Sequence, residues 1–163
     1  MVREVFCLKI NKKLLILCLV IPLAVGGIAA LLTGSGMDAF EALNQPPLSP
    51  PGWLFPVVWT ILYILMGIAS YLVPTSGKSQ ESIRRALVLY GMQLAFNFLW
   101  PVFFFCLSTY LFAFIWLVVL WLLILATTTS FYRLSYIAGY LMIPYLIWVM
   151  FAGYLNLGIY FLN

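Results

Sequence analysis

The sequence contains no histidine, and only four acidic and eight basic residues among its 163 positions. Without histidine the chain lacks the commonest general base and the commonest haem or metal ligand. Its three cysteines, Cys7, Cys18 and Cys106, have no CxxC spacing, so we expect buried free thiols. A complete phosphate-binding glycine loop and the GxSxG sequence of hydrolases are also missing. These absences argue against a hydrolase or a metalloenzyme, and we predict no metal site and no obligatory cofactor.

The scarcity of charge also indicates a membrane protein, because 66% of the residues are hydrophobic and the mean hydropathy is +1.12. A membrane-spanning helix needs roughly 20 apolar residues, and the sequence contains five such runs. We therefore predict an all-α integral membrane protein, a five-transmembrane-helix bundle that forms one domain over residues 14–163. A basic segment, residues 1–13, precedes it. The predicted spans are residues 14–33, 53–73, 86–106, 110–131 and 136–161.

The few charges lie where a membrane topology requires them. With five spans, all basic residues fall on one side of the membrane, and the opposite side receives Asp38 and Glu41. Basic loops stay in the cytoplasm, so we predict a cytoplasmic N-terminus, an outer C-terminus and a bacterial cytoplasmic membrane, and no nucleic-acid partner. A cleaved signal peptide is the alternative for the first span, although its 20 apolar residues exceed the usual length of about 7–15. The basic residues are Arg3, Lys9, Lys12, Lys13, Lys78, Arg84, Arg85 and Arg133.

The third span has two different faces. At 100° per residue, Gln93, Asn97 and Trp100 share one stripe, and Gly91 and Ala95 share the opposite one. Small residues at this spacing let transmembrane helices approach closely, either within the chain or across a homodimer. The two amides either bind a ligand or hydrogen-bond other helices of the bundle. We predict a ligand-binding face and a dimer contact at Gly91 and Ala95.

The second and fifth spans also carry aromatic stripes. Such stripes form cores or membrane-interface belts as well as ligand cages, but asparagines at mid-membrane favour a cavity for a flat apolar ligand. Pro101 and Pro144 lie within spans, where a proline bends the helix. The stripes are Phe55, Trp59 and Tyr63 in the second span, and Tyr145, Trp148, Ala152 and Asn156 in the fifth.

The first long loop contains the sequence LNQPPLSPPGW at residues 43–53. Two Pro-Pro pairs exclude a helix and keep the segment stiff, so that closing over a ligand would cost little further entropy. We interpret residues 34–52 as a lid on the outer mouth of the cavity, with a simple rigid connector as the alternative. The predicted lid residues are Pro46, Leu48, Pro50 and Pro51.

Three sequence motifs resemble one family. They are LNQPPLSPPGWLFPVVWTILY (43–63), QLAFNFLW (93–100) and PYLIWVMFAGYLN (144–156), and the similarity runs from about residue 22 to the C-terminus. The chain resembles the TspO/MBR family of translocator proteins and tryptophan-rich sensory proteins, formerly called peripheral-type benzodiazepine receptors. The resemblance implies five transmembrane helices, often a homodimer, and a pocket beneath the first long loop.

By the same resemblance, the pocket takes porphyrins and synthetic isoquinoline or benzodiazepine ligands, and sterols in animal members. Positions that match the family motifs then become ligand contacts, with three prolines in the lid. The implied contacts are Trp59, Tyr63, Asn97, Trp100, Trp148, Ala152 and Asn156, and the prolines are Pro46, Pro50 and Pro51.

The chain departs from the family pattern in the loop, which usually reads WYxxLxKPxWxPP. Here Ala39 and Phe40 replace the first pair, Gln45 replaces the lysine and Leu48 replaces the tryptophan. Bacterial relatives are reported to degrade protoporphyrin in light with loop and fifth-span tryptophans, of which this chain retains Trp148. The C-terminal GIYFLN lacks the basic residue of the sterol-recognition pattern, so we predict no sterol binding there.

The predicted function is therefore that of a membrane receptor or sensor for tetrapyrroles, such as porphyrins and haem precursors, or for similar flat apolar molecules. One alternative is light-dependent porphyrin degradation, for which Trp148 is the only catalytic candidate; we expect no enzyme activity otherwise. Passive transport of the ligand and a structural role in a larger complex are further alternatives. The absence of charges deep in the spans argues against an ion-coupled carrier.

Overall fold

The computed structural model describes residues 11–34 and 40–163, and this part of the chain is all-helical. Five helices are long and apolar enough to cross a membrane, which confirms the prediction of a five-span, multi-pass membrane protein. The side of the membrane on which each terminus lies stays a prediction. The elements are α1 (Lys12–Thr33), α3 (Leu54–Leu72), α4 (Gln80–Pro101), the π-helix η1 (Val102–Cys106), α5 (Tyr110–Leu134) and α6 (Tyr136–Leu162).

The helix starts follow capping residues as well as hydropathy. The side chain of Ser79 accepts a hydrogen bond from the backbone N–H of Ser82, so α4 begins six residues before the predicted apolar span. This polar first turn also carries an ion pair between Glu81 and Arg85, 2.7 Å apart. Asn11 caps α1 in the same way. A side-chain oxygen at the N-cap satisfies an N–H group that has no partner within the helix.

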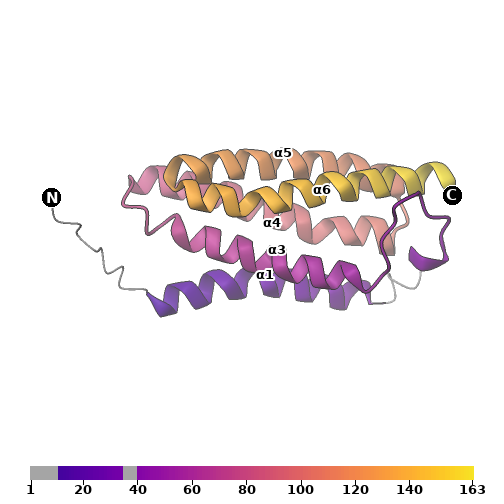
Figure 1. Cartoon of the computed structure of the whole chain (residues 1–163), viewed down its shortest axis with the longest axis horizontal. Helices are drawn as coiled ribbons and strands as arrows, with labels where there is room; N and C mark the ends of the chain where they lie inside the picture. The colour runs from indigo at the N-terminus through magenta and orange to yellow at the C-terminus, as the bar shows by residue number, and fades with distance from the viewer. Residues whose placement is uncertain (1–10, 35–39) are drawn as a thin grey trace.

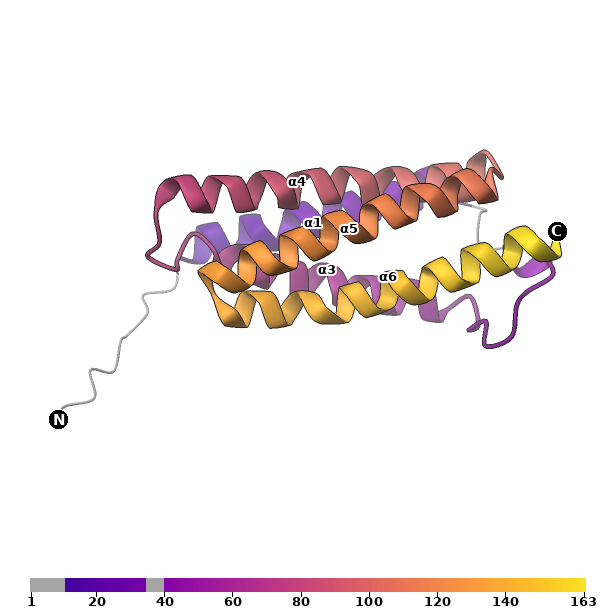
Figure 2. The ribbon, with the colours of Figure 1, turned by 90° about the horizontal axis from the view of Figure 1, so that it is seen from above.

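The five helices form a closed ring. Around this ring, α1 contacts α3, α3 contacts α6, α6 contacts α5, α5 contacts α4, and α4 returns to α1. Figures 1 and 2 show the helices running side by side along the long axis, with the start of α1 and the end of α6 at opposite ends. The core is continuous through the middle of the ring, where Met66, Gln93, Met142 and Tyr145 are each 0% exposed.

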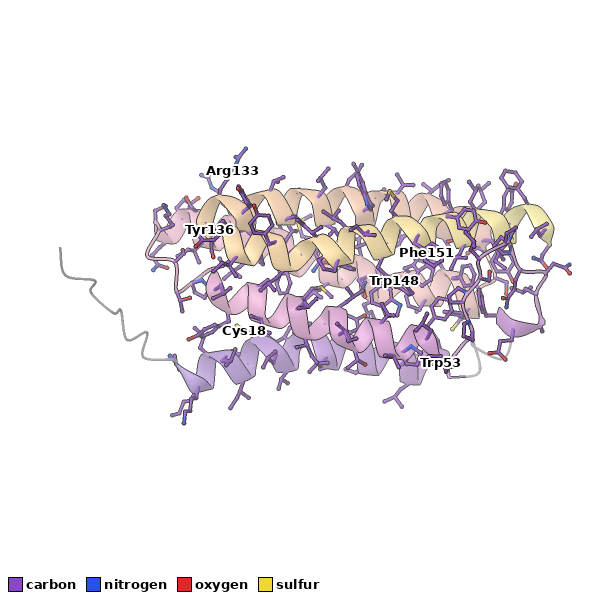
Figure 3. All side chains as sticks on the ribbon, in the orientation of Figure 1. Cys18, Trp53, Arg133, Tyr136, Trp148 and Phe151 are labelled. Atoms are coloured by element: carbon purple, nitrogen blue, oxygen red, sulfur yellow. The ribbon has the colours of Figure 1, made fainter. Side chains whose placement is uncertain are left out.

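The lysines and arginines of the described residues gather at one end of the bundle. Figure 1 places the α3–α4 and α5–α6 connections at the end where the chain begins. Every lysine and arginine within residues 11–34 and 40–163 lies at or beside this end; Figure 3 labels Arg133 there, and Trp53 lies toward the opposite end. Arg3, Lys9 and Asp38 lie outside the described residues. This arrangement is the one that the predicted topology requires.

Candidate functional site

A cavity of ≈ 510 Å³ occupies the end of the ring that carries the first long loop. This volume lies in the range of small-molecule sites, about 300–1,000 Å³. Helices α1, α3, α4 and α6 contribute to its wall, together with η1 and the loop. Seven of the ten predicted ligand-binding residues line it: Phe55, Trp59, Tyr63, Asn97, Trp100, Ala152 and Asn156.

Helix α3 supplies the aromatic side of the cavity. Phe55, Trp59 and Tyr63 recur at every fourth position, so they lie on one face of the helix and all three line the cavity. The rings of Trp59 and Tyr63 stack with centroids 5.6 Å apart, and the ring of Phe40 meets Phe55 edge-on at 5.3 Å. The stack fixes the rings in a wall that offers flat apolar surface.

The floor of the cavity is a buried hydrogen-bond network that joins three helices. The hydroxyl of Tyr63 donates to Asn97 Oδ1 (2.7 Å), and Asn97 Nδ2 donates to the hydroxyl of Tyr145 (2.8 Å). Tyr145 in turn donates to Gln93 Oε1 (3.0 Å). Tyr63 and Asn97 line the cavity, whereas Gln93 and Tyr145 lie beneath it and do not. Asn97 therefore both faces the cavity and ties the helices together, while the contacts of Gln93 are those of an interhelical bond.

A second amide, Asn156, fixes the wall on the α6 side. The indole N–H of Trp100 donates to Asn156 Oδ1 (3.3 Å), and Asn156 Nδ2 donates to the backbone carbonyl of Tyr110 (2.8 Å). These bonds connect α4, α6 and the start of α5. The edge of the indole is thereby held, and its ring is available to the cavity.

Pro101 ends α4 and the next five residues form the π-helix η1. Proline has no N–H to donate within the helix. In the segment that follows, the backbone N–H of Leu107 bonds the carbonyl of Val102, five residues earlier, across the wider turn of a π-helix (3.0 Å). Phe104 and Phe105 of this segment line the cavity. The ring of Phe104 stacks on Trp100, with centroids 5.3 Å apart.

Trp148 lies behind the cavity wall and does not line it. Its ring contacts those of Phe55 and Phe151, with centroids 6.0 Å and 5.7 Å apart, and Figure 3 shows it between α6 and α3. Its indole N–H is buried without a hydrogen-bond partner in the described part of the chain. The predicted redox candidate therefore lies outside the cavity lining and contacts the ring of Phe55, which does line the cavity.

The predicted lid is attached to the end of α6. Pro46 is buried, and a Cβ at Gly158 would lie 2.6 Å from the Pro46 Cβ. The hydroxyl of Tyr154 donates to the carbonyl of Pro47 (2.8 Å), and the backbone N–H of Asn44 donates to Asn163 Oδ1 (3.0 Å). Leu48 is 82% exposed with a φ of 66°. None of the four described lid residues, Pro46, Leu48, Pro50 and Pro51, lines the cavity.

Substituting Gly158 tests this attachment. We expect Gly158→Val to displace Pro46 and release the loop, because the new side chain would occupy the space of the proline ring. Protease cleavage between residues 44 and 52 should accelerate at least about tenfold, as expected for loss of roughly 1.4 kcal/mol of local stability. Gly91→Val is the control, since a Cβ there meets nothing within 4 Å; equal cleavage of both variants would contradict the attachment.

Gly91 and Ala95 lie on an exposed face of α4, and a Cβ at Gly91 would meet no atom within 4 Å. Their contacts therefore do not support close packing within the chain. The homodimer contact stays a prediction. In a bilayer this face meets lipid or another protein.

Several lining residues were missed by the sequence reasoning. Helix α1 contributes a stripe of lining residues, and the signal for it in the sequence is the run of small residues AVGGIAA at 24–30. Trp53 also lines the cavity, and it follows directly after the proline-rich segment. Cys18 is partly buried and Cys106 is exposed, so the expectation of a buried thiol was wrong for Cys106, which lies at the end of η1. No metal-ligand cluster occurs among residues 11–34 and 40–163. The missed lining residues include Leu23, Gly26, Gly27, Ala30, Thr33, Glu41, Trp53, Thr60, Phe104 and Phe105.

Comparison with known proteins gives one consistent match. The sequence model of the TspO/MBR family matches residues 18–162. The chain is 39% identical over 156 residues to the tryptophan-rich protein TspO of Chlorobaculum tepidum, covering 94% of this chain and 99% of the relative. It is 41% identical over 117 residues to the tryptophan-rich sensory protein of Cereibacter sphaeroides, covering 72% of each chain. It is also 36% identical over 125 residues to the translocator protein of Bos taurus, covering 76% of this chain and 73% of that one.

Proposed function

The chain belongs to the TspO/MBR family, and on this basis we propose that it is a membrane receptor or sensor that binds a flat apolar ligand, with tetrapyrroles as the leading class. The observation that carries this proposal is the cavity, which combines stacked aromatic rings with two buried amides. Aromatic walls suit flat apolar molecules and a few polar groups fix their orientation. The relatives include a tryptophan-rich sensory protein and a translocator protein.

Binding is favoured over passage because the described core beneath the cavity is filled. Met66, Gln93, Met142 and Tyr145 are fully buried there, directly below the floor residues Tyr63 and Asn97. A ligand that moved further along the bundle would have to break the network that joins α3, α4 and α6. Passive transport therefore requires a rearrangement that binding alone does not.

Light-dependent degradation is the second candidate, and its residue is Trp148. This indole contacts the ring of Phe55 but does not itself line the cavity, so a photochemical role would require electron transfer without direct contact between the indole and the ligand. Illumination of the porphyrin complex distinguishes the two functions. A new absorbing product that forms in the native chain and is absent in Trp148→Phe would favour the enzyme; bound porphyrin that stays intact would favour the receptor.

Substitution of Trp59 tests the proposed site directly. We expect Trp59→Leu to weaken porphyrin binding about tenfold, because a stacked aromatic pair contributes up to roughly 1.5 kcal/mol beyond its buried area. The measurement is saturable quenching of tryptophan fluorescence in purified protein, in the dark, with protoporphyrin IX and with an uncharged porphyrin ester. Trp121→Leu, which removes an indole bonded to the carbonyl of Leu146 between α5 and α6, should retain affinity. Absence of saturable quenching by either porphyrin in the native chain would overturn the proposal.

A further inference from the structure

We propose that the cavity selects uncharged or cationic flat ligands over carboxylates, and that Glu41 sets this preference; this rests on the binding function proposed above. Glu41 lines the cavity at its loop end, and it is the single charged side chain in the wall formed by the described residues. The side chain is exposed. A ligand carboxylate at this end would therefore meet a negative charge.

The loop offers no cation to offset this charge. Residues 34–52 contain Asp38 and Glu41 but no lysine or arginine. The described lysines and arginines lie at the other end of the bundle, beyond helices of 19–27 residues. At 1.5 Å per residue this is about 30 Å, several times the Debye length of roughly 8 Å at physiological ionic strength. Among the described residues, the charge of Glu41 therefore has no basic side chain near it.

Three polar side chains of the wall have already donated their protons within the protein. The hydroxyl protons of Tyr63 and Thr60 and the indole proton of Trp100 are already donated, to Asn97 Oδ1, the carbonyl of Pro56 and Asn156 Oδ1 respectively. The hydroxyl oxygens of Tyr63 and Thr60, and the carboxylate of Glu41, retain lone pairs. A carboxylate only accepts hydrogen bonds, whereas a pyrrole N–H or an amine donates them. These three groups therefore offer no proton to a ligand carboxylate, whereas the oxygens of Tyr63 and Thr60 can accept one from a ligand that donates.

The cavity also opens toward the bilayer. Exposed residues of α1, among them Leu23, Gly27 and Ala30, line it together with Trp53, which directly precedes α3, and with Pro56 and Thr60 of α3. A Cβ at Gly27 would meet nothing within 4 Å, and Figure 3 shows Trp53 at the outer edge of α3. A ligand that enters between these membrane-spanning helices crosses apolar surroundings, where an ionised carboxylate is costly. Entry between the membrane-spanning helices and the negative charge of Glu41 therefore both disfavour a ligand carboxylate.

The test compares protoporphyrin IX, which carries two carboxylates, with its dimethyl ester. Both are titrated into the full-length protein in nanodiscs, in the native chain and in Glu41→Gln, Glu41→Lys and Glu81→Gln. The ratio of the two affinities is compared between variants, because this comparison cancels the greater partitioning of the ester into lipid. Glu81 is a matched control, since it is an exposed carboxylate at the other end of the bundle, paired with Arg85.

We expect Glu41→Gln to improve the affinity of the acid relative to the ester about fivefold, the upper end for one exposed charge pair. Glu41→Lys should improve it further, and Glu81→Gln should leave the ratio unchanged. In the native chain, added salt should reduce the penalty on the acid. An identical ratio in all four proteins, with both porphyrins bound, would overturn the charge preference alone. Failure of both porphyrins to bind any of the proteins would overturn the proposed function, and the charge preference with it.

Discussion

Replacing Asn97 by leucine is expected to lower the free energy of unfolding by about 1–3 kcal/mol, because two buried interhelical hydrogen bonds are lost at once, each worth roughly 0.6–1.7 kcal/mol in a membrane protein. The substitution removes the acceptor of Tyr63 and the donor to Tyr145. Both tyrosines are buried, so each hydroxyl would remain without that partner inside the bundle. The measurement is unfolding of the purified protein by heat or by a denaturing detergent.

A double-mutant cycle with Tyr63→Phe separates the network from simple repacking. Tyr63→Phe alone removes one bond and should cost less than Asn97→Leu. The double variant should be little worse than Asn97→Leu alone, because the partner of Tyr63 has already been removed. Costs that simply add, or an Asn97→Leu variant within 0.5 kcal/mol of the native chain, about the effect of an ordinary surface substitution, would show that the network contributes no coupling.

Asn97→Leu should also weaken ligand binding, since Asn97 lines the cavity. The same titration as for Trp59 measures this effect. Thr129→Val provides a matched control, because Thr129 bonds only the carbonyl of Ala126 within its own helix and is exposed. Loss of affinity without loss of stability would separate a ligand contact from a structural one.

The five spans could be predicted from the sequence because each is a long apolar run, and hydropathy measures that property directly. The start of α4 could not, because Ser79 and the charged turn after it are polar and lie outside the apolar window. Helix capping and an ion pair determine that boundary. The order of the helices around the closed ring could not be predicted from hydropathy either. Every helix carries apolar residues on its exposed side as well as in the core, so hydropathy does not show which face meets which neighbour.

The candidate site was partly predictable for a similar reason. The periodicity of α3 identifies Phe55, Trp59 and Tyr63 as one face, and all three do line the cavity. On α6 the same periodicity joins Trp148 to Asn156, yet Trp148 packs against Phe55 and Phe151 and does not line the cavity. Spacing identifies a face but not what packs over it.

The contribution of α1 was missed because its cavity-facing positions carry no aromatic or amide groups. The cavity stripe there consists of small residues such as Gly26, Gly27 and Ala30, which function by leaving space. A pattern search for chemically distinctive side chains passes over such residues. The close approach of Gly26 to the ring of Tyr63 becomes visible only in the packed structure.

This approach makes Gly26→Ala the second substitution with a large expected effect. The added methyl group would overlap the ring of Tyr63, which is only 7% exposed, is stacked on Trp59 and donates to Asn97. The ring has to move, and its hydrogen bond and its stacking are lost together. We expect a destabilisation of about 1–3 kcal/mol, as for an overpacked core, and at least a tenfold loss of porphyrin affinity, measured by thermal unfolding and fluorescence quenching.

The neighbouring glycine supplies the control for stability. Gly27→Ala makes the same chemical change one position later in α1, where the new Cβ meets nothing within 4 Å. Because alanine favours a helix over glycine by up to about 1 kcal/mol, Gly27→Ala should be neutral or stabilising. The two variants are therefore expected to differ in sign, and helix propensity cannot account for that difference. If Gly26→Ala unfolded at the same temperature as Gly27→Ala and still bound porphyrin normally, Tyr63 would have room to move. The wall of the cavity would then be adaptable, and the rigid stack of Trp59 on Tyr63 would not determine which ligands fit.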